Sequence, residues 1–403
     1  MSKKRHGEHS RPMKFSYAVV LLSFLTLTSC NTKTLFTPIE NHFSAPIAVS
    51  VDTTRNRAYV VNSNNNYAYT NASLSILDIT TPSAPTLLSN TQNPISIPNF
   101  SSNIYLNTTT QQAYIPNRLS DNNSDNIDSL LRINLDESSD LFGAVDSFVA
   151  GDNPFGLSCC DASGRLYTVN VGGTLGVYDF STPTTPLSFS IALSGALQSG
   201  ASYSGANSEE VVLLGSQAFV TNRAGRIYVI NTDEVTDPTK NPIDYLILNA
   251  GDARGIATDG THLFVVDGSV SPGIVRIINP STLTPITPDS PARTEIDLLA
   301  STSIQNNTVN VGKNPNQILI FDNKVYISNQ DDDTVTVFNL ADIAATPIPT
   351  TNISVGDKPF GLTAFTAGTS SYLYVTNLFS NSISIVDITG PTTPTTSVAT
   401  FAP

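Results

Sequence analysis

The side chains of this chain that could do chemistry are mostly carboxylates. The 403 residues include 33 Asp and Glu, four His, three Cys and no Trp. His6 and His9 precede an apolar leader segment, so His42 and His262 are the only imidazoles after it. Zinc, copper and haem sites usually need more imidazole than that, and no Gly-x-Ser-x-Gly nucleophile motif precedes a helical pattern. The sequence therefore predicts no catalytic residues, no metal ligands and no cofactor.

Two acidic runs have the composition of calcium loops or of turns. Asp121 to Asn126 begins like an EF-hand loop, but Arg132 occupies position 12, where the bidentate glutamate belongs. This pattern excludes an EF-hand and leaves a looser calcium site open. Asp331 to Asp333 lies between two predicted strands, where Asp favours turns, and we expect a solvated turn there.

The elements that must position these residues are defined by a short phrase that recurs seven times. Its form is an aromatic residue, two mostly apolar or hydroxyl residues and a final Asn or Asp. The copies are Tyr59–Asn62, Tyr114–Asn117, Tyr167–Asn170, Phe219–Asn222, Phe264–Asp267, Tyr326–Asn329 and Tyr374–Asn377. Their spacing of 45 to 62 residues, with strand chemistry, indicates a β-propeller.

Each copy belongs to a unit of four short strands, which is clearest at the C-terminus. Gly356 to Leu362 leads into the first strand, Tyr372 to Asn377 forms the second, and Ser382 to Ile388 alternates apolar and polar residues as a third. A final strand is expected near Val398 to Phe401. A single such sheet exposes its faces and edges, and radial stacking covers them. The predicted fold is all-β, a seven-bladed β-propeller of four-stranded antiparallel blades.

The same phrases resemble a known family. Gly356 to Leu362, Tyr374 to Asn377 and Ser384 to Asp387 are similar to the consensus of the YVTN family of seven-bladed β-propellers. The resemblance covers about residues 41–403. It implies a bacterial or archaeal surface or periplasmic protein, and it implies little about activity because the family is defined by its scaffold.

The N-terminal segment has the pattern of a secretion signal. Residues 15–29 are apolar behind a basic flank and end in Leu27-Thr28-Ser29-Cys30, which resembles a bacterial lipobox with Cys30 as the lipidated residue. The expected domains are a signal peptide (1–29), a tether (30–40) and the propeller (41–403). By the same resemblance, Asn31, which is not the aspartate that marks inner-membrane retention, implies the outer membrane of a Gram-negative envelope. An ordinary signal peptide with an incidental Cys is the alternative, and Met13 is an alternative start.

Charge and cysteines restrict the partners. The chain without residues 1–29 has 15 basic and 32 acidic residues. An acidic body repels phosphate backbones, so no nucleic acid is expected, and the charge favours a monomer. An envelope compartment permits disulfides. Cys159 and Cys160 are adjacent, so they form either a disulfide between neighbours or two reduced thiols on opposite faces of a strand.

Symmetry predicts one candidate site. In a propeller, the loops that enter the innermost strands converge at the mouth of the central channel, which is a common place for a ligand. Aligning the blades on Gly361 places Phe155, Arg254 and Asn316 with Phe360, and extending the alignment to the looser copies adds Ala45, Ser102 and Glu209. The flanking residues are Glu210, Lys313, Asn314 and Lys358. We expect Glu209 and Arg254 to form a charged pair there; alternatively, these groups satisfy only one another and water.

These features predict a lipid-anchored, non-enzymatic envelope scaffold that binds a protein, peptide or glycan. The alternative is a hydrolase or lactonase-like propeller that uses carboxylates and a divalent cation. That alternative needs several acids converging in one funnel, and the alignment places only Glu209 and Glu210 there. The third hypothesis is that the chain is a purely structural surface protein.

Overall fold

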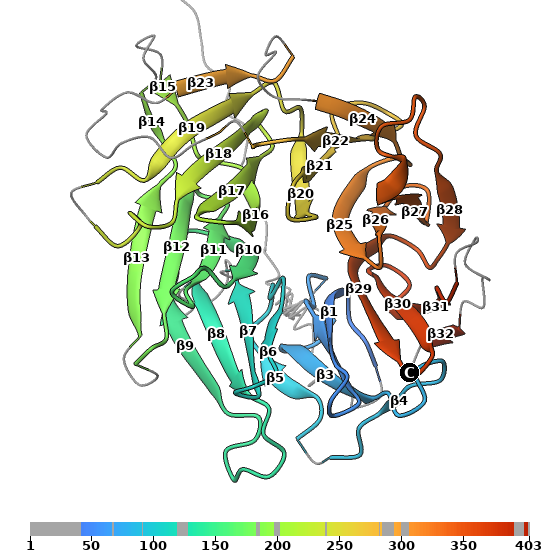
Figure 1. Cartoon of the computed structure of the whole chain (residues 1–403). Coiled ribbons are helices and arrows are strands. Elements are labelled where there is room, and N and C mark those ends of the chain that lie inside the picture. The colour runs from blue at the N-terminus through green and yellow to red at the C-terminus, as the bar shows by residue number, and fades with distance from the viewer. Residues whose placement is uncertain are drawn as a thin grey trace, which may run out of the picture. The chain divides into compact units, whose positions relative to one another are not determined.

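The chain folds into a ring of antiparallel sheets. The computed structural model describes residues 42–401, apart from positions 67, 91, 119–127, 183–185, 197–201, 238–239, 282, 284–293, 300–305 and 391–398. Figure 1 shows seven blades around a central opening, with the chain running once round the ring from blue to red. One short 3-10 helix, η1 (Leu340–Asp342), is the only helix in these described ranges. The predicted all-β, seven-bladed fold is confirmed.

The first three blades follow one another along the chain, each with its innermost strand first. Blade 1 contains β1 (Pro46–Asp52), β2 (Arg57–Asn62), β3 (Ala72–Asp78) and β4 (Thr86–Leu87), and β5 (Ile95–Ile97) also pairs with β3. Blade 2 contains β6 (Tyr105–Asn107), β7 (Gln112–Asn117), β8 (Ser129–Asn134) and β9 (Val145–Val149). Blade 3 contains β10 (Pro154–Cys159), β11 (Leu166–Asn170), β12 (Thr174–Asp179) and β13 (Leu187–Ala192).

The remaining blades repeat this order, with two additions. The small hairpin β14 (Gly195–Ala196) and β15 (Ser202–Tyr203) precedes blade 4, which contains β16 (Ser208–Leu214), β17 (Gln217–Asn222), β18 (Arg226–Asn231) and β19 (Ile243–Leu248). Blade 5 contains β20 (Ala253–Thr258), β21 (Leu263–Asp267), β22 (Ile274–Ile278) and β24 (Asn306–Asn310). Between β22 and β24 the chain returns to blade 4, where β23 (Thr294–Asp297) pairs parallel with β19.

Blades 6 and 7 complete the ring. Blade 6 contains β25 (Pro315–Phe321), β26 (Lys324–Asn329), β27 (Thr334–Asn339) and β28 (Thr351–Ser354). Blade 7 contains β29 (Pro359–Ala367), β30 (Ser370–Asn377), β31 (Ser382–Asp387) and β32 (Ala399–Phe401). The C-terminal strand β32 is therefore the fourth strand of the last blade, as the sequence predicts. The sequence also suggests that residues 33–40 add a strand beside Val398 to Phe401, and these residues lie outside the described ones.

The final Asn of the repeated phrase ties neighbouring parts of its blade together, most completely in blade 6. In blade 6, Asn329 Oδ1 accepts the N–H of Gly312 (3.0 Å), and its Nδ2 donates to Thr336 Oγ1 (2.8 Å). In blade 7, Asn377 Nδ2 donates to Ser384 Oγ (3.0 Å). A Cβ atom on Gly312 would lie 2.6 Å from the Asn329 amide carbon, so only glycine allows this approach. The Gly and Asn positions of the repeat therefore hold the entering loop against the second and third strands.

Blade 5 replaces this amide link by an ion pair. Asp267 stands at the Asn position and accepts the N–H of Asp252 (2.9 Å). Arg276, on the neighbouring strand, donates to Asp267 Oδ2 through Nη2 (2.7 Å). Arg276 takes the register position that Thr336 has in blade 6. The two substitutions compensate each other, because the buried Asp267 needs a cation that the usual hydroxyl cannot supply.

The inner strands approach one another closely around the channel. Glycine occupies the same position in blades 3, 5 and 7, at Gly156, Gly255 and Gly361. A Cβ atom there would lie 2.3 to 2.5 Å from a carbonyl oxygen of the next blade's inner strand, for example Ile47 O for Gly361. The contact of Gly361 with Ile47 and Ala48 also closes the ring between blades 7 and 1.

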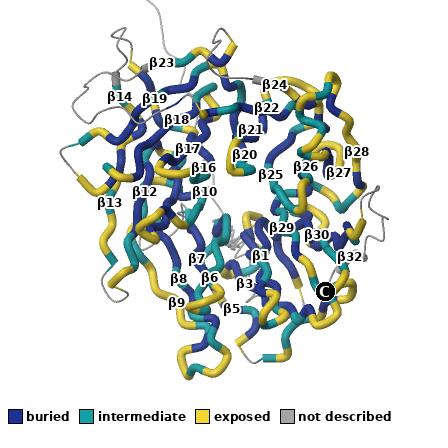
Figure 2. The backbone as a smooth tube through the Cα atoms, viewed as in Figure 1, coloured by how far each residue is buried: buried dark blue, intermediate teal, exposed yellow. Residues whose placement is uncertain are grey.

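The core lies between neighbouring blades. Tyr167 and Val169 of blade 3, for example, pack with Val211 and Val220 of blade 4 in one buried cluster. Figure 2 shows buried residues along the strands and exposed residues in the loops at the rim. No helix in the described ranges is long and apolar enough to cross a membrane. Cys30 and the predicted signal segment lie outside the described residues.

Candidate functional site

Strand register gives the equivalent positions in the seven blades. The residue that pairs with the last residue of the repeated phrase is Pro46, Ser101, Pro154, Ser208, Ala253, Pro315 or Pro359. We call the residues that follow these the first ring: Ile47, Ser102, Phe155, Glu209, Arg254, Asn316 and Phe360. The next residues form the second ring: Ala48, Asn103, Gly156, Glu210, Gly255, Gln317 and Gly361.

The predicted alignment agrees with this register in six blades and is wrong in blade 1. There Ile47, not Ala45, occupies the first ring. Ala45 lies directly before Pro46 with φ at 51°, the left-handed conformation that Asn153, Asn314 and Lys358 adopt before their prolines. The loop of blade 1 lacks the Gly-Asp phrase that precedes blades 3, 5 and 7, so the sequence offered no anchor for the alignment.

The second ring narrows the channel by hydrogen bonds that cross it. Its long residues, Asn103, Glu210 and Gln317, lie on alternate blades 2, 4 and 6, with small residues between them. Asn103 Nδ2 donates to Glu210 Oε1 (3.1 Å), and Gln317 Nε2 donates to the same oxygen (2.9 Å). Gly156 leaves the space for this, because a Cβ atom on it would lie 2.9 Å from Glu210 Oε2. Three blades that share no sheet are thus joined at the channel axis.

Burial controls the charge of Glu210. Its side chain is almost fully enclosed, with 5% of the residue exposed. This burial raises the pKa of Glu210 to about 8, against the lowering effect of the hydrogen bond from Gln317. The neighbouring Glu209 raises the pKa further, and a backbone hydrogen bond from Leu157 lowers it. Near neutral pH the carboxyl group is mainly protonated.

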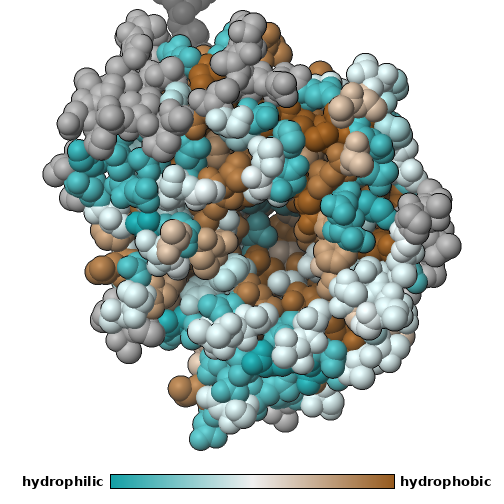
Figure 3. Space-filling model, in the orientation of Figure 1, coloured by the Kyte–Doolittle hydropathy of each residue, from teal (hydrophilic) through white to brown (hydrophobic). Residues whose placement is uncertain are grey.

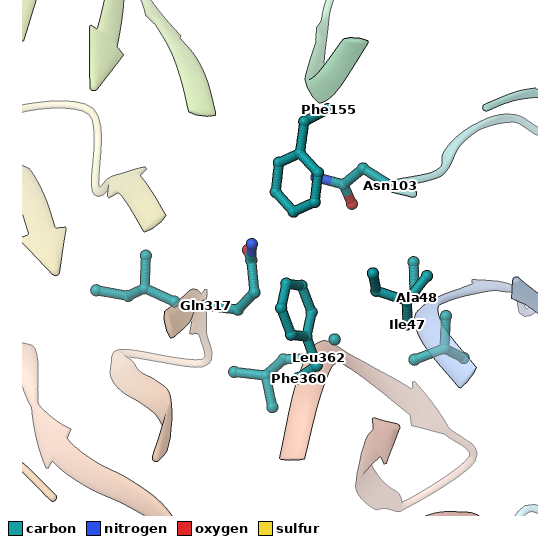
Figure 4. A pocket seen from close by; sticks show the side chains of 10 residues that line it. Ile47, Ala48, Asn103, Phe155, Gln317, Phe360 and Leu362 are labelled. Carbon is teal, nitrogen blue, oxygen red and sulfur yellow. The ribbon is translucent and has the colours of Figure 1, made fainter. Parts of the chain in front are cut away.

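The aromatic residues of the first ring meet across the channel. Phe155 and Phe360, from blades 3 and 7, lie edge to face with ring centroids 6.2 Å apart. Figure 4 shows both rings pointing into the central space together with Asn103 and Gln317. They line a small pocket, open to solvent, to which Ile47 also contributes. In Figure 3 the face of the ring is hollowed at its centre, and apolar side chains gather around the hollow.

Arg118 is a site residue that the sequence analysis missed. It follows the repeated phrase of blade 2, and its guanidinium carbon lies 4.9 Å from the centroid of the Phe155 ring. The buried Nε atom of Arg118 has no hydrogen-bond partner within the described ranges. Burial lowers the pKa of Arg118, while the charges of Glu209 and Asp128 raise it. A signal existed in the sequence, because Arg118 and Arg223 both directly follow the final Asn of their phrases.

Arg254 is fixed by its own strand and by blade 6. Its Nη2 donates to Asp252 Oδ2 (2.7 Å), and its Nη1 donates to Asn314 Oδ1 (2.5 Å) and to the carbonyl oxygen of Pro315 (2.9 Å). Asp252 also accepts from Arg223 Nε (2.8 Å). These two guanidinium groups lower the pKa of Asp252 against the effect of burial. Arg254 is therefore a buried connection between blades 5 and 6.

The expected Glu209–Arg254 pair is not the one that forms. Glu209 lies next to Arg254 in the first ring, but Arg254 bonds to Asp252, which is two residues away on the same segment. The cation nearest to Glu209 is that of Arg223, with Nε 3.5 Å from Oε2. Glu209 Oε2 is buried and has no hydrogen-bond partner in the described part of the chain. Burial raises the pKa of Glu209, and Arg223 and Arg254 act in the opposite direction.

The other predicted residues divide between the first ring and its rim. Asn316 is 6% exposed, and its Oδ1 lacks a partner among the described residues. Asn314 Nδ2 donates to Asp331 Oδ1 (3.2 Å), to which Lys358 Nζ also binds. Lys313 Nζ lies 3.4 Å from Asp332 at an exposed position. The aspartates of the 331–333 turn thus hold rim cations.

Cys159 and Cys160 lie at the far end of β10, away from this mouth. The structure joins their sulfur atoms in a disulfide. The Tyr105 hydroxyl lies 3.5 Å from Cys160 Sγ. The described residues contain no group of three or more His, Cys, Asp or Glu side chains placed to hold a metal ion. The acidic run at 121–126 falls outside the described residues.

Comparisons with known proteins agree with the propeller architecture. Residues 56–92 and 370–399, in blades 1 and 7, match the LVIVD repeat model. No curated protein sequence matches the chain significantly. The β-propeller domain of Myceliophteria thermophila Cps50 (Swd1) superposes with a TM-score of 0.58 at 10% identity, over 86% of this chain and 98% of that one.

Two further solved structures are similar. A functionally unknown protein from Desulfotomaculum acetoxidans has a TM-score of 0.52 at 12% identity, over 89% of this chain and 99% of that one. The computationally designed Ika8 protein has a TM-score of 0.51 at 10% identity, over 89% of this chain and 88% of that one. At these identities the likeness concerns the fold alone. The chain is a seven-bladed β-propeller, two segments of which match the LVIVD repeat model.

Proposed function

We propose that this chain is a non-enzymatic binding scaffold of the YVTN type, anchored to the cell envelope through lipid on Cys30. The first ring binds a polar group of a protein, peptide or glycan, and the closed ring of blades keeps that site rigid. The acidic chain acts as a monomer and does not bind nucleic acid. The lipobox-like segment before Cys30 and the polar, rigid mouth support this proposal.

One observation carries the choice of site. Three buried polar groups at the mouth, Arg118 Nε, Glu209 Oε2 and Asn316 Oδ1, have no partner among the described residues. Leaving a buried donor or acceptor unpaired costs roughly 1–3 kcal/mol. Phe360, at the same level, is partly exposed and lines the open pocket. Unpaired groups beside an accessible aromatic ring are what a ligand-binding site requires.

The arrangement of acids favours binding over hydrolysis. A carboxylate-based hydrolase needs acids that converge on one reacting centre. Glu209 and Glu210 diverge instead, because Glu209 lies near Arg223 while Glu210 bonds to Asn103 and Gln317. Asp252 is held by two guanidinium groups. The acids of the mouth therefore act as acceptors and counter-ions in this proposal.

A ligand screen with matched variants tests the proposed site. Thermal unfolding of the mature chain is measured against short peptides, neutral oligosaccharides and small carboxylates. We expect at least one class to raise the melting temperature of the wild type and to lose this effect in Phe360→Ala. Phe379→Ala is the control, because Phe379 lies in the same blade and is 63% exposed on the surface. The proposal fails if no class binds, or if Phe379→Ala weakens binding as much as Phe360→Ala.

A further inference from the structure

The cations at the channel mouth are not balanced by the acids that contact them. Arg223 and Arg254 share Asp252, and Glu209 lies 3.5 Å from Arg223. Arg118 has no ion pair with any described residue and rests on the Phe155 ring. Of these three guanidinium groups, that of Arg118 alone makes no ion pair with a described residue.

The acids that could neutralise Arg118 are engaged or held apart. Asp128, of the same blade, accepts the backbone N–H of Asn153 (3.0 Å). Glu209 influences Arg118 electrostatically, but no hydrogen bond joins them. Arg118 is half-buried, and a buried donor such as its Nε is costly to leave without a hydrogen-bond partner. The first ring also offers two buried acceptors, Glu209 and Asn316, which are 8% and 6% exposed and need donors.

We propose that the channel mouth binds a small monocarboxylate that carries hydroxyl or N–H donors close to its carboxyl group. The carboxylate pairs with Arg118, and the adjacent donors bond to Glu209 Oε2 and Asn316 Oδ1. A single charge fits because Arg118 is the one guanidinium group of the three without an ion pair to a described residue, and the charge of Glu209 opposes a dianion such as phosphate. A sugar acid and the C-terminus of a peptide both present this chemistry. This inference rests on the proposed function of the mouth.

Isothermal titration with four probes tests the contributions of the ligand's charge and of its hydrogen-bond donors separately. D-glucuronate and N-acetylglycine carry a carboxylate with hydroxyl or N–H donors, and they distinguish the sugar and peptide sources. Cyclohexanecarboxylate has the charge without the donors, and methyl glucoside has the donors without the charge. We expect glucuronate or N-acetylglycine to bind at least tenfold more tightly than the last two, because charge-assisted hydrogen bonds are stronger than neutral ones.

Variants assign the binding to the named groups. Arg118→Met should abolish carboxylate binding without lowering the melting temperature, since it removes a cation that the fold leaves unpaired. Arg132→Met is the matched control, because Arg132 lies over Phe148 and Phe180 on the perimeter and is paired with Asp146. It should leave binding unchanged. Glu209→Gln removes a negative charge from the mouth, so it should strengthen binding of cyclohexanecarboxylate. The preference for ligands that carry hydroxyl or N–H donors should therefore become smaller.

The outcomes separate this inference from the proposed function. Equal binding of methyl glucoside and glucuronate, or carboxylate binding retained in Arg118→Met, overturns the carboxylate proposal. If that binding is still lost in Phe360→Ala, the mouth remains a ligand site for another chemistry. If no probe depends on either Arg118 or Phe360, the carboxylate proposal fails, and the ligand screen with Phe360→Ala decides the proposed function.

Discussion

The buried Glu210 should make the stability of the ring depend on pH. The perturbation is Glu210→Gln, which imitates the protonated carboxyl group and keeps an acceptor for Asn103 and Gln317. In the folded protein the pKa of Glu210 is about 8, against an ordinary 4.5. The folded state therefore holds a proton that the unfolded chain releases above pH 4.5. Stability contributed by this group is present at low pH and is lost progressively between pH 4.5 and 8.

The size of the effect follows from the two pKa values. Each tenfold difference in proton affinity corresponds to about 1.4 kcal/mol. Between pH 5 and pH 9 the free energy of unfolding of the wild type should therefore fall by roughly 4 kcal/mol relative to that of Glu210→Gln. Urea unfolding followed by far-ultraviolet circular dichroism measures this, since the chain has no Trp. Glu295→Gln, at an exposed carboxylate, should keep the wild-type pH dependence. If the difference between wild type and Glu210→Gln is the same at both pH values, the reasoning about the buried carboxyl group is wrong.

Three further predictions concern the anchor and the scaffold. Cys30→Ser should leave the membrane fraction, because lipid chains provide about 0.8 kcal/mol per buried CH₂; unchanged fractionation would contradict the lipid anchor. Arg276→Met should lower the free energy of unfolding by about 3–5 kcal/mol, because it leaves Asp267 buried and unpaired. The double variant Asp267→Asn, Arg276→Thr should recover most of this loss in urea unfolding, and no recovery would argue against the compensating pair. Gly361→Ala should lower the free energy of unfolding by about 1–3 kcal/mol in the same assay, because the added methyl group would clash with the carbonyl oxygen of Ile47 where blade 7 meets blade 1. An unchanged free energy of unfolding would contradict that close contact.

The architecture was accessible from the sequence because the repeat is a local pattern with a physical cause. The Gly and Asn positions lie close together within one blade, and in blade 6 Gly312 and Asn329 bond to each other, so the pattern can be read locally in the sequence. The same regularity placed Phe155 and Phe360 in one ring. Strand β23 could not be predicted, since its parallel pairing with β19 joins a long connection of blade 5 to the edge of blade 4.

The pairing within the mouth was less accessible, because it depends on side-chain reach. Glu209 and Arg254 occupy equivalent positions, yet Arg254 bonds to Asp252 because that acid lies two residues away. Arg118 lies outside the ring positions, and only the folded ring shows it over Phe155. The hydrogen bonds of Glu210 join blades 2, 4 and 6, and a blade-by-blade alignment contains no information about contacts across the axis.

The central claim is that the channel mouth holds polar groups that the protein itself leaves unpaired. A high-resolution crystal structure of the unliganded protein at neutral pH tests this most directly. We predict that Arg118 lies over Phe155 with ordered solvent at its Nε, and that solvent also occupies the positions facing Glu209 Oε2 and Asn316 Oδ1. An Arg118–Glu209 ion pair with hydrogen-bond distances below 3.2 Å would contradict the account, because the mouth would then satisfy itself and leave no group for a ligand.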